Sequence, residues 1–213
     1  MNITEQIKAD AEHFFKEAKT SHNWRHTLRV VAMCKKIAKT EPDADIEILI
    51  CAAYLHDIGR KYQDETKGAI CHAAKSATLA EPFINKLSID ENRKNNIIRC
   101  IKSHRFRGKN IPNTLEAKIL FDADKLDSIG AIGVARAFLF AGEIGASLHN
   151  DVTDIDKTVS YSKEDTGYRE FNIKLSKIKD KMFTKEGRRI AEERDSFMRL
   201  FFERFLLEHE GKK

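Results

Sequence analysis

The stretch Asp45-Ile-Glu-Ile-Leu-Ile-Cys-Ala-Ala-Tyr-Leu-His-Asp-Ile-Gly59 combines an apolar helix with two ionisable side chains at its end. Asp45 is suited to cap the start of this helix, and Gly59 stands where a C-terminal stop is expected. A neighbouring imidazole and carboxylate both need polar partners once they are buried. A metal ion would satisfy both, so His56 and Asp57 are candidate metal ligands.

The helical pattern continues over most of the chain. Apolar residues recur at three- and four-residue spacing, and only three prolines interrupt 213 residues. We therefore predict an all-α protein, a compact single-domain helical bundle over residues 1–213, in which C-terminal helices at 169–209 complete the core. An apolar stripe from Ile190 to Phe205 is predicted to be core or the surface of a homodimer.

Several helix starts can be assigned from capping residues. Thr20 or Ser21 is a suitable N-cap for the helix that carries the first central histidine. Ser88, followed three residues later by Glu91, has the spacing of a capping box. Thr114 is predicted to cap the helix that carries an acidic cluster.

Composition and charge limit the classes of function. The chain is 41% hydrophobic and 33% charged, as in globular proteins rather than disordered ones. It contains no apolar run of the roughly 18 to 20 residues that a membrane span needs, and acids occur throughout Met1 to Phe15. We expect a cytoplasmic protein with no membrane partner. The net charge of +5 is a mild bias toward anionic ligands.

His26 shares a helix face with Val30, Met33 and Ile37, so its side chain is predicted to point inward. Taken alone, an inward histidine is more often a hydrogen-bonded core residue than a metal ligand. His26 becomes a candidate ligand because other candidates occur elsewhere in the chain.

The segment Leu120-Phe-Asp-Ala-Asp-Lys-Leu-Asp127 places three carboxylates among apolar residues. So much negative charge on a half-buried helix is costly unless a cation is present. Periodicity does not choose the ligand, because Asp122 lies on one partly apolar face and Asp124 and Asp127 lie on another. Asp127, Asp122 and Lys125 are candidates for proton transfer during catalysis.

The order His26-Thr-Leu-Arg-Val30, then His56-Asp57, then Ala123-Asp124-Lys125-Leu126 resembles the HD-domain superfamily of metal-dependent phosphohydrolases. The resemblance implies an HD-type helical domain whose metal site forms within about residues 20–130. Carried over position by position, it implies four metal ligands: His26, His56, Asp57 and Asp124. Asp124 is chosen because the family's aspartate follows the alanine.

Further segments resemble a small bacterial branch of that superfamily, the YpgQ/YedJ-like group. These segments are His22-Asn-Trp-Arg-His26, His56-Asp-Ile-Gly-Arg60, His72-Ala-Ala-Lys-Ser76 and Asp122-Ala-Asp-Lys-Leu-Asp-Ser-Ile-Gly130. The resemblance implies hydrolysis of nucleoside triphosphates to monophosphate and pyrophosphate by metal-activated water. The alternatives are a nucleotide phosphomonoesterase or cyclic-nucleotide phosphodiesterase on the same site, or a non-catalytic nucleotide-binding module.

Two imidazoles and two carboxylates suit one divalent ion such as Mn²⁺, Fe²⁺, Ni²⁺ or Co²⁺, with Mg²⁺ also suitable. His72 and His104 fall where bimetallic relatives of the superfamily place additional ligands, so they are candidates for a second metal or for binding substrate phosphate. Arg60 and Arg105 are predicted to bind phosphate. The expected partner is a nucleotide or another phosphorylated small molecule. Nucleic acid is not expected, because the chain lacks a recognition motif and a consistently basic helix face.

Overall fold

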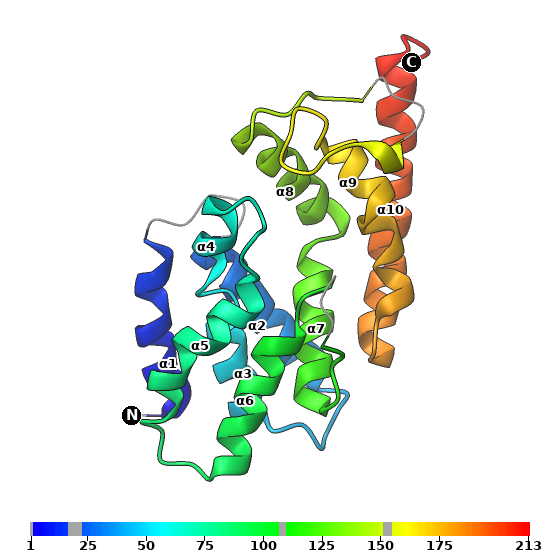
Figure 1. Ribbon diagram of the computed structural model, residues 1–213. Coiled ribbons are helices and arrows are strands. Elements are labelled where there is room, and N and C mark those ends of the chain that lie inside the picture. Colours follow the sequence, from blue (N-terminus) through cyan, green and yellow to red (C-terminus); the bar gives the residue numbers. More distant parts are fainter. Residues whose placement is uncertain (1, 17–22, 107–109, 151–154) are drawn as a thin grey trace. The chain divides into compact units, whose positions relative to one another are not determined.

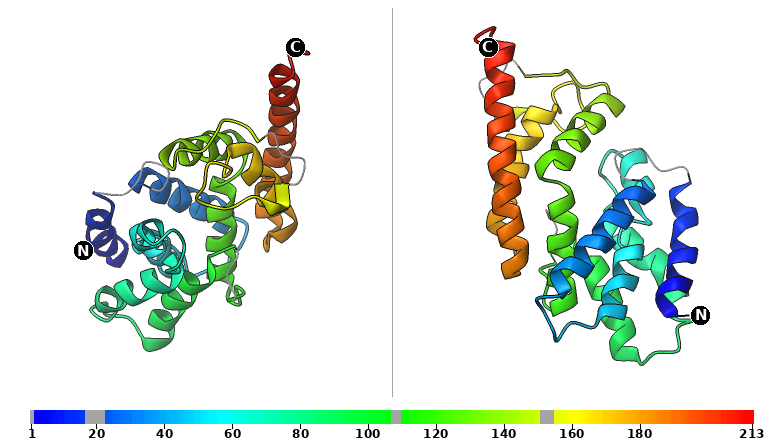
Figure 2. Two further views of the ribbon diagram at one scale, coloured as in Figure 1. Left: turned by 45° about the horizontal axis from the view of Figure 1, so that its top comes forward. Right: turned by 180° about the vertical axis from the view of Figure 1, so that it is seen from behind.

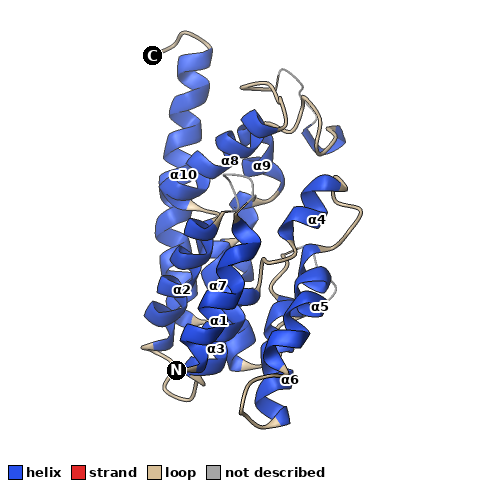
Figure 3. Ribbon diagram, turned by 90° about the vertical axis from the view of Figure 1, so that its left-hand side faces the viewer, coloured by secondary structure: helices blue, strands red, loops and turns tan. Residues whose placement is uncertain are grey.

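The computed structural model describes residues 2–16, 23–106, 110–150 and 155–213, and in these ranges it contains helices but no strand (Figures 1 and 3). The all-α prediction is confirmed. The chain divides into two compact units, Met1–Asp124 and Lys125–Lys213. The single-domain organisation stays a prediction. Among the described residues, no helix is both long enough and apolar enough to cross a membrane.

The first unit consists of helices joined by short connections. Its elements are α1 (Ile3–Glu12), α2 (Trp24–Ala38), α3 (Ile46–Leu55), α4 (Arg60–Glu65), α5 (His72–Ile84), α6 (Glu91–Ser103) and most of α7 (Leu115–Asp127). A short 3₁₀ turn, His13–Phe15, continues α1.

Helix α3 is the centre of the first unit. Every residue from Ile48 to Leu55 is buried, because the sequence is apolar on all sides of the helix. It packs against α1, α2 and α6, and Figure 2 shows α2 and α3 running beside each other. The residues that follow α3, His56 and Asp57, are therefore held in the interior of this unit.

The observed helix starts confirm some capping predictions and correct others. Asp45 accepts a hydrogen bond from the backbone of Ile48, as predicted. Helix α2 begins at Trp24 after the N-cap Asn23, and the predicted caps Thr20 and Ser21 lie outside the described residues.

Thr114 caps α7 as predicted, because the Thr114 hydroxyl accepts the N–H of Ala117 at 3.2 Å. The capping box at Ser88 is wrong: Asp90 caps α6 by accepting the N–H of Arg93, since a closer carboxylate competes successfully for the free N–H groups.

The second unit contains the C-terminal end of α7, together with α8 (Gly130–Glu143), α9 (Gly167–Ile173) and α10 (Lys185–His209). Figure 2 shows α10, in orange and red, alongside α8. The apolar stripe of α10 is core in part, because Met198 and Phe202 are buried and the rings of Phe202 and Phe171 stack at 4.4 Å. Phe197 is 45% exposed, and the homodimer stays a prediction.

Candidate metal centre

Four side chains predicted as ligands converge inside the first unit. His26 comes from α2, His56 and Asp57 follow α3, and Asp124 comes from α7. The Nε2 atom of His26 lies 3.4 Å from Nε2 of His56, 3.6 Å from Oδ2 of Asp57 and 3.4 Å from Oδ1 of Asp124. The Nε2 atom of His56 lies 3.8 Å and 3.9 Å from the same two carboxylate oxygens. We call these four residues the first cluster.

These distances fit a set of ligands around one cation. Ligand atoms about 2.0–2.2 Å from an ion lie roughly 2.8–3.1 Å from their neighbours in an octahedral arrangement and roughly 3.3–3.6 Å in a tetrahedral one. The separations around His26, 3.4–3.6 Å, match the tetrahedral spacing and are somewhat longer than the octahedral one. The nitrogen and carboxylate oxygen donors are those that first-row divalent ions accept.

The tautomer of His56 is set by the helix in front of it. Its Nδ1 atom lies 2.7 Å from the carbonyl oxygen of Ala53, which can only accept a hydrogen bond. Nδ1 therefore carries the proton, and the Nε2 lone pair faces the cluster. Burial lowers the pKa of His56 to about 4, so the ring is neutral at neutral pH. A neutral ring with an oriented lone pair is suited to metal binding.

A second cluster lies on the other oxygen of Asp57. Oδ1 of Asp57 is 3.6 Å from Nε2 of His72 and 3.5 Å from Nε2 of His104, and these two nitrogens are 3.0 Å apart. The Nδ1 atom of His104 donates to the carbonyl of Ile101 at 2.7 Å, so its lone pair is also on Nε2. Asp57 is thus shared between two groups of side chains, each with the donor types of a metal site.

The charge and hydrogen bonding of Asp57 favour a cation. Asp57 is only 4% exposed, and among the described residues its buried Oδ1 has no hydrogen-bond partner. Burial would raise the pKa of Asp57, but contacts with His56, His104 and His26 outweigh it and hold the pKa well below its ordinary value. A buried carboxylate with an unsatisfied oxygen is costly unless a cation is bound nearby. The residues present therefore fit a divalent metal ion.

The two arginines predicted to bind phosphate both have side-chain partners. Nε and Nη2 of Arg60 bond the same oxygen of Asp64, at 3.1 Å and 3.0 Å. Arg105 contacts the thiol of Cys71, directly before His72. Burial alone would raise the pKa of Cys71, but hydrogen bonds from backbone N–H groups and from Arg105 lower it below its ordinary value. Arg105 therefore lies beside the start of α5, next to the second cluster.

The residues predicted to transfer protons differ in their surroundings. Asp122 is fully buried and belongs to neither cluster. Lys125 and Asp127 are also buried, on the last turn of α7. Oδ2 of Asp127 forms an ion pair with Arg136 of α8 at 2.8 Å, and the backbone carbonyl of Asp127 accepts a second hydrogen bond from this guanidinium. Catalytic roles for these three residues stay predictions.

Gln63 is a site residue that the sequence did not reveal. Its side-chain oxygen lies 2.7 Å from Nδ1 of His72. The pairing depends on the turn between α4 and α5, which no periodic pattern predicts.

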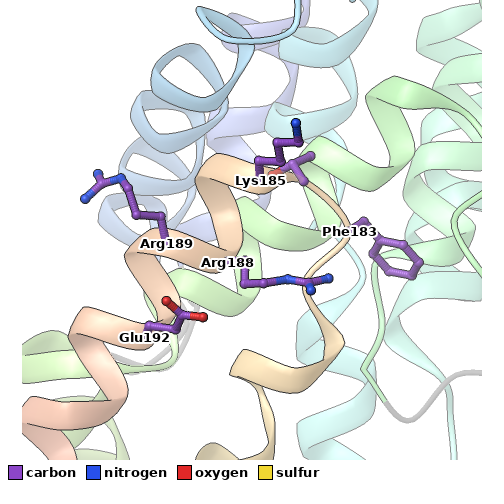
Figure 4. Close-up of a pocket in the computed structure, with 6 residues that line it drawn as sticks. Phe183, Lys185, Arg188, Arg189 and Glu192 are labelled. Atoms are coloured by element: carbon purple, nitrogen blue, oxygen red, sulfur yellow. The ribbon is translucent and has the colours of Figure 1, made fainter.

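A surface pocket of about 310 Å³ lies at the start of α10 in the second unit, and its lining residues are drawn in Figure 4. It is lined by Phe183, Thr184, Lys185, Arg188, Arg189 and Glu192. Two of its cations already have partners: Arg189 pairs with Glu186, and Arg188 donates to the carbonyl of Met182. The pocket contains none of the predicted site residues.

Comparison with known proteins identifies the family of the chain. A model of the HD domain matches residues 23–129, which include all six residues of the two clusters. The chain belongs to the HD-domain family. It is 33% identical over 202 residues to YpgQ, an uncharacterised protein of Bacillus subtilis (strain 168), and this match covers 92% of the chain and 89% of the relative.

Solved structures agree with this assignment. The structure resembles the crystal structure of Bacillus subtilis YpgQ in complex with ADP, with a TM-score of 0.70, 30% sequence identity and coverage of 97% of both chains. It is equally similar to an HD-superfamily hydrolase from Bacillus thuringiensis, with a TM-score of 0.70 and 26% identity over 97% of this chain and 96% of that one. The fold is therefore that of HD-superfamily proteins.

Proposed function

We propose that this protein is a metal-dependent phosphohydrolase that converts nucleoside triphosphates to monophosphate and pyrophosphate. The observation that carries the proposal is the buried convergence of His26, His56, Asp57 and Asp124, at separations that fit one cation. A divalent cation held there would lower the pKa of a water ligand and neutralise charge that develops on a phosphoryl group.

The chain's own contribution is to hold the donors in their binding orientation. The carbonyl of Ala53 keeps the proton of His56 on Nδ1, so Nε2 is presented without rearrangement. Asp57 remains ionised and offers one oxygen to each cluster. Asp57, His72 and His104 are also suited to a second cation, because two lone pairs and a carboxylate oxygen face each other there, but the proposed hydrolysis requires only the cation of the first cluster.

The nature of the substrate rests on the relatives and on the cations of the chain. YpgQ was crystallised with ADP, a nucleotide that carries a pyrophosphate linkage, and this supports a nucleotide substrate here. Arg105 lies beside the second cluster, where its guanidinium can contact a polyphosphate. Arg60 can bind phosphate only if the substrate competes with Asp64 for it.

A metal-supplemented activity screen tests the proposal. Purified protein is incubated with Mn²⁺, Co²⁺, Ni²⁺ or Mg²⁺ and with nucleoside triphosphates, monophosphates or cyclic dinucleotides, and phosphate and pyrophosphate are measured separately. We expect pyrophosphate from triphosphates. Phosphate from monophosphates would indicate a phosphomonoesterase, and opening of cyclic substrates a phosphodiesterase. Tight nucleotide binding without turnover in any metal would indicate a non-catalytic module.

A further inference from the structure

Gln63 occupies an unusual position for a glutamine on a short surface helix. It is only 8% exposed, and it is separated by nine residues from its partner, His72. The turn that brings them together is closed by the N–H of Gly68, which donates to the carbonyl of Gln63 at 2.8 Å. Gly68 has a φ of +93°, a conformation that favours glycine. The backbone of this turn thus aims the Gln63 amide at the start of α5.

The orientation of the Gln63 amide follows from its contacts. Its Oε1 atom lies 3.4 Å from the backbone nitrogen of His72, which can only donate, and 2.7 Å from Nδ1 of the His72 ring. If the amide NH₂ group of Gln63 stood there instead, it would face the backbone N–H of His72, which is also a donor. The oxygen therefore faces His72, and the ring must donate from Nδ1.

The tautomer of His72 decides what the second cluster can bind. With the proton on Nδ1, the Nε2 lone pair of His72 faces the Nε2 lone pair of His104 at 3.0 Å and Oδ1 of Asp57 at 3.6 Å. Three electron-rich atoms in one buried place repel each other unless a cation lies among them. With the proton on Nε2, His72 would donate to one of these atoms and no longer be a ligand.

We infer that Gln63 is a positioning residue, which fixes the proton of His72 on Nδ1 and thereby prepares Asp57, His72 and His104 to bind a second divalent cation. The inference rests on the proposed function, since it concerns the same centre. Gln63 acts through His72, whose backbone N–H and ring Nδ1 both lie at its side-chain oxygen. Partners of this kind typically change metal affinity by about 10–100-fold.

Variants at position 63 separate hydrogen bonding from packing. Gln63→Glu keeps an acceptor oxygen, whereas Gln63→Leu and Gln63→Met keep much of the volume without one. Gln6→Leu, on α1 and outside both clusters, is the matched control for loss of a glutamine. We expect the affinity for the second Mn²⁺ to fall by about 10–100-fold in Gln63→Leu and Gln63→Met and to stay within a few-fold in Gln63→Glu and Gln6→Leu. The first Mn²⁺ should bind all five proteins alike.

Two measurements on the full chain decide the question. Long-range ¹H–¹⁵N correlation spectra of the metal-free protein report which nitrogen of His72 is protonated, and equilibrium dialysis against Mn²⁺ gives the number of ions per chain. We expect Nδ1–H in the wild type and in Gln63→Glu, with that preference lost in Gln63→Leu. An Nε2–H tautomer in the wild type, a single Mn²⁺ per wild-type chain, or full second-ion affinity in both variants lacking the acceptor would each overturn the inference and leave the hydrolase proposal standing. Failure of the wild type to bind any divalent cation would overturn both.

Discussion

Asp57 is the residue on which the whole centre depends, because its two oxygens face different pairs of histidines. Oδ2 lies near His26 and His56, and Oδ1 lies near His72 and His104. The adjacency of His56 and Asp57 at the end of an apolar helix was enough to predict that they need a shared partner. That the second oxygen of Asp57 serves another pair could not be derived from spacing, because His72 and His104 reach it from separate helices.

The choice between Asp122 and Asp124 shows a limit of periodicity. Both side chains are buried, so each apolar face of α7 is covered, and burial alone does not distinguish them. Oδ1 of Asp124 lies 3.4 Å from Nε2 of His26, within the first cluster. The resemblance to the family selected this residue where the helical pattern could not. Its role as a ligand stays part of the proposal.

Gly59 provides a prediction about close packing next to the site. A Cβ atom here would lie 2.6 Å from the backbone nitrogen of Ser76 on α5, whose hydroxyl accepts the N–H of Gly59 at 2.9 Å. Gly59→Ala must therefore move backbone, and we expect a loss of about 1–3 kcal/mol in the free energy of unfolding, measured by urea titration. Gly142→Ala on α8 is the control: its Cβ meets nothing within 4 Å, and alanine favours a helix, so we expect no loss. Equal stability of the two variants would refute the packing argument.

At the scale of elements, the start of α3 and its burial were predicted well, because its capping residue and its apolar composition indicate the same helix. Asp45 caps it, its residues from Ile48 to Leu55 are all buried, and the site residues follow its last turn. Helix α4 was not predicted, since six polar residues give no apolar period. Gly59, expected to stop the preceding helix, instead precedes α4. Glu116, which accepts the N–H of Asp45, was also missed because its partner is 71 residues away.

Substitutions of Asp45 can distinguish the contribution of the helix cap from that of the ion pair at the start of α3. Its carboxylate caps the helix and forms a two-pronged pair with Arg93. Burial acts to raise the pKa of Asp45, but the hydrogen bonds from Arg93 and the helix lower it overall. We expect Asp45→Ala to lower the free energy of unfolding by about 1 kcal/mol or more, because it removes both the cap and the ion pair. Asp45→Asn keeps the cap and should lower it by only about 0.5 kcal/mol, because the ion pair is partly exposed.

The pH dependence of these variants follows from the sign of the pKa shift. A lowered carboxylate pKa contributes stability that is present above the ordinary value, 3.8, and is lost as the pH falls through the folded-state pKa. The difference between wild type and Asp45→Asn in urea titrations should therefore disappear in acid. A difference that grew as the pH fell would contradict the assignment.

The end of α7 is predicted to depend on Arg136. This residue pairs with the buried carboxylate of Asp127, so Arg136→Ala leaves a buried charge without this partner. We expect a loss of about 3–5 kcal/mol in the stability of the second unit. Asp127→Asn in the same background should recover part of it, because the buried charge is removed. If the stability losses of Arg136→Ala and Asp127→Asn simply added in the double variant, the two residues would not interact.

At the scale of the molecule, the centre joins helices that are distant in the sequence. Its side chains come from α2, the end of α3, α5, the end of α6 and α7, all within the first unit. The fold class could be predicted from the sequence because nearly every segment has a helical period. The division into two compact units could not, since no linker or change in composition marks residue 124.

A cation bound to these helices should stabilise the folded chain. At a concentration about 100 times its Kd, a ligand that binds only the folded state contributes about 2.7 kcal/mol, or roughly 5–10 °C in Tm. We expect Mn²⁺ to raise the Tm of chelator-treated protein by this amount in differential scanning calorimetry. His13→Ala, a histidine outside the clusters, should retain the shift, and His56→Ala should lose it. An equal rise in both variants would place the stabilising ion elsewhere.

The central claim is that Asp57 holds the cation on which hydrolysis depends. The most direct test is to measure, on the same preparations of wild type and Asp57→Ala, the Mn²⁺ retained per chain after dialysis and the rate of pyrophosphate release from a nucleoside triphosphate. We expect the folded Asp57→Ala protein to lose both the bound Mn²⁺ and the activity. An Asp57→Ala protein that retains its metal and remains fully active would show that Asp57 is not the essential ligand.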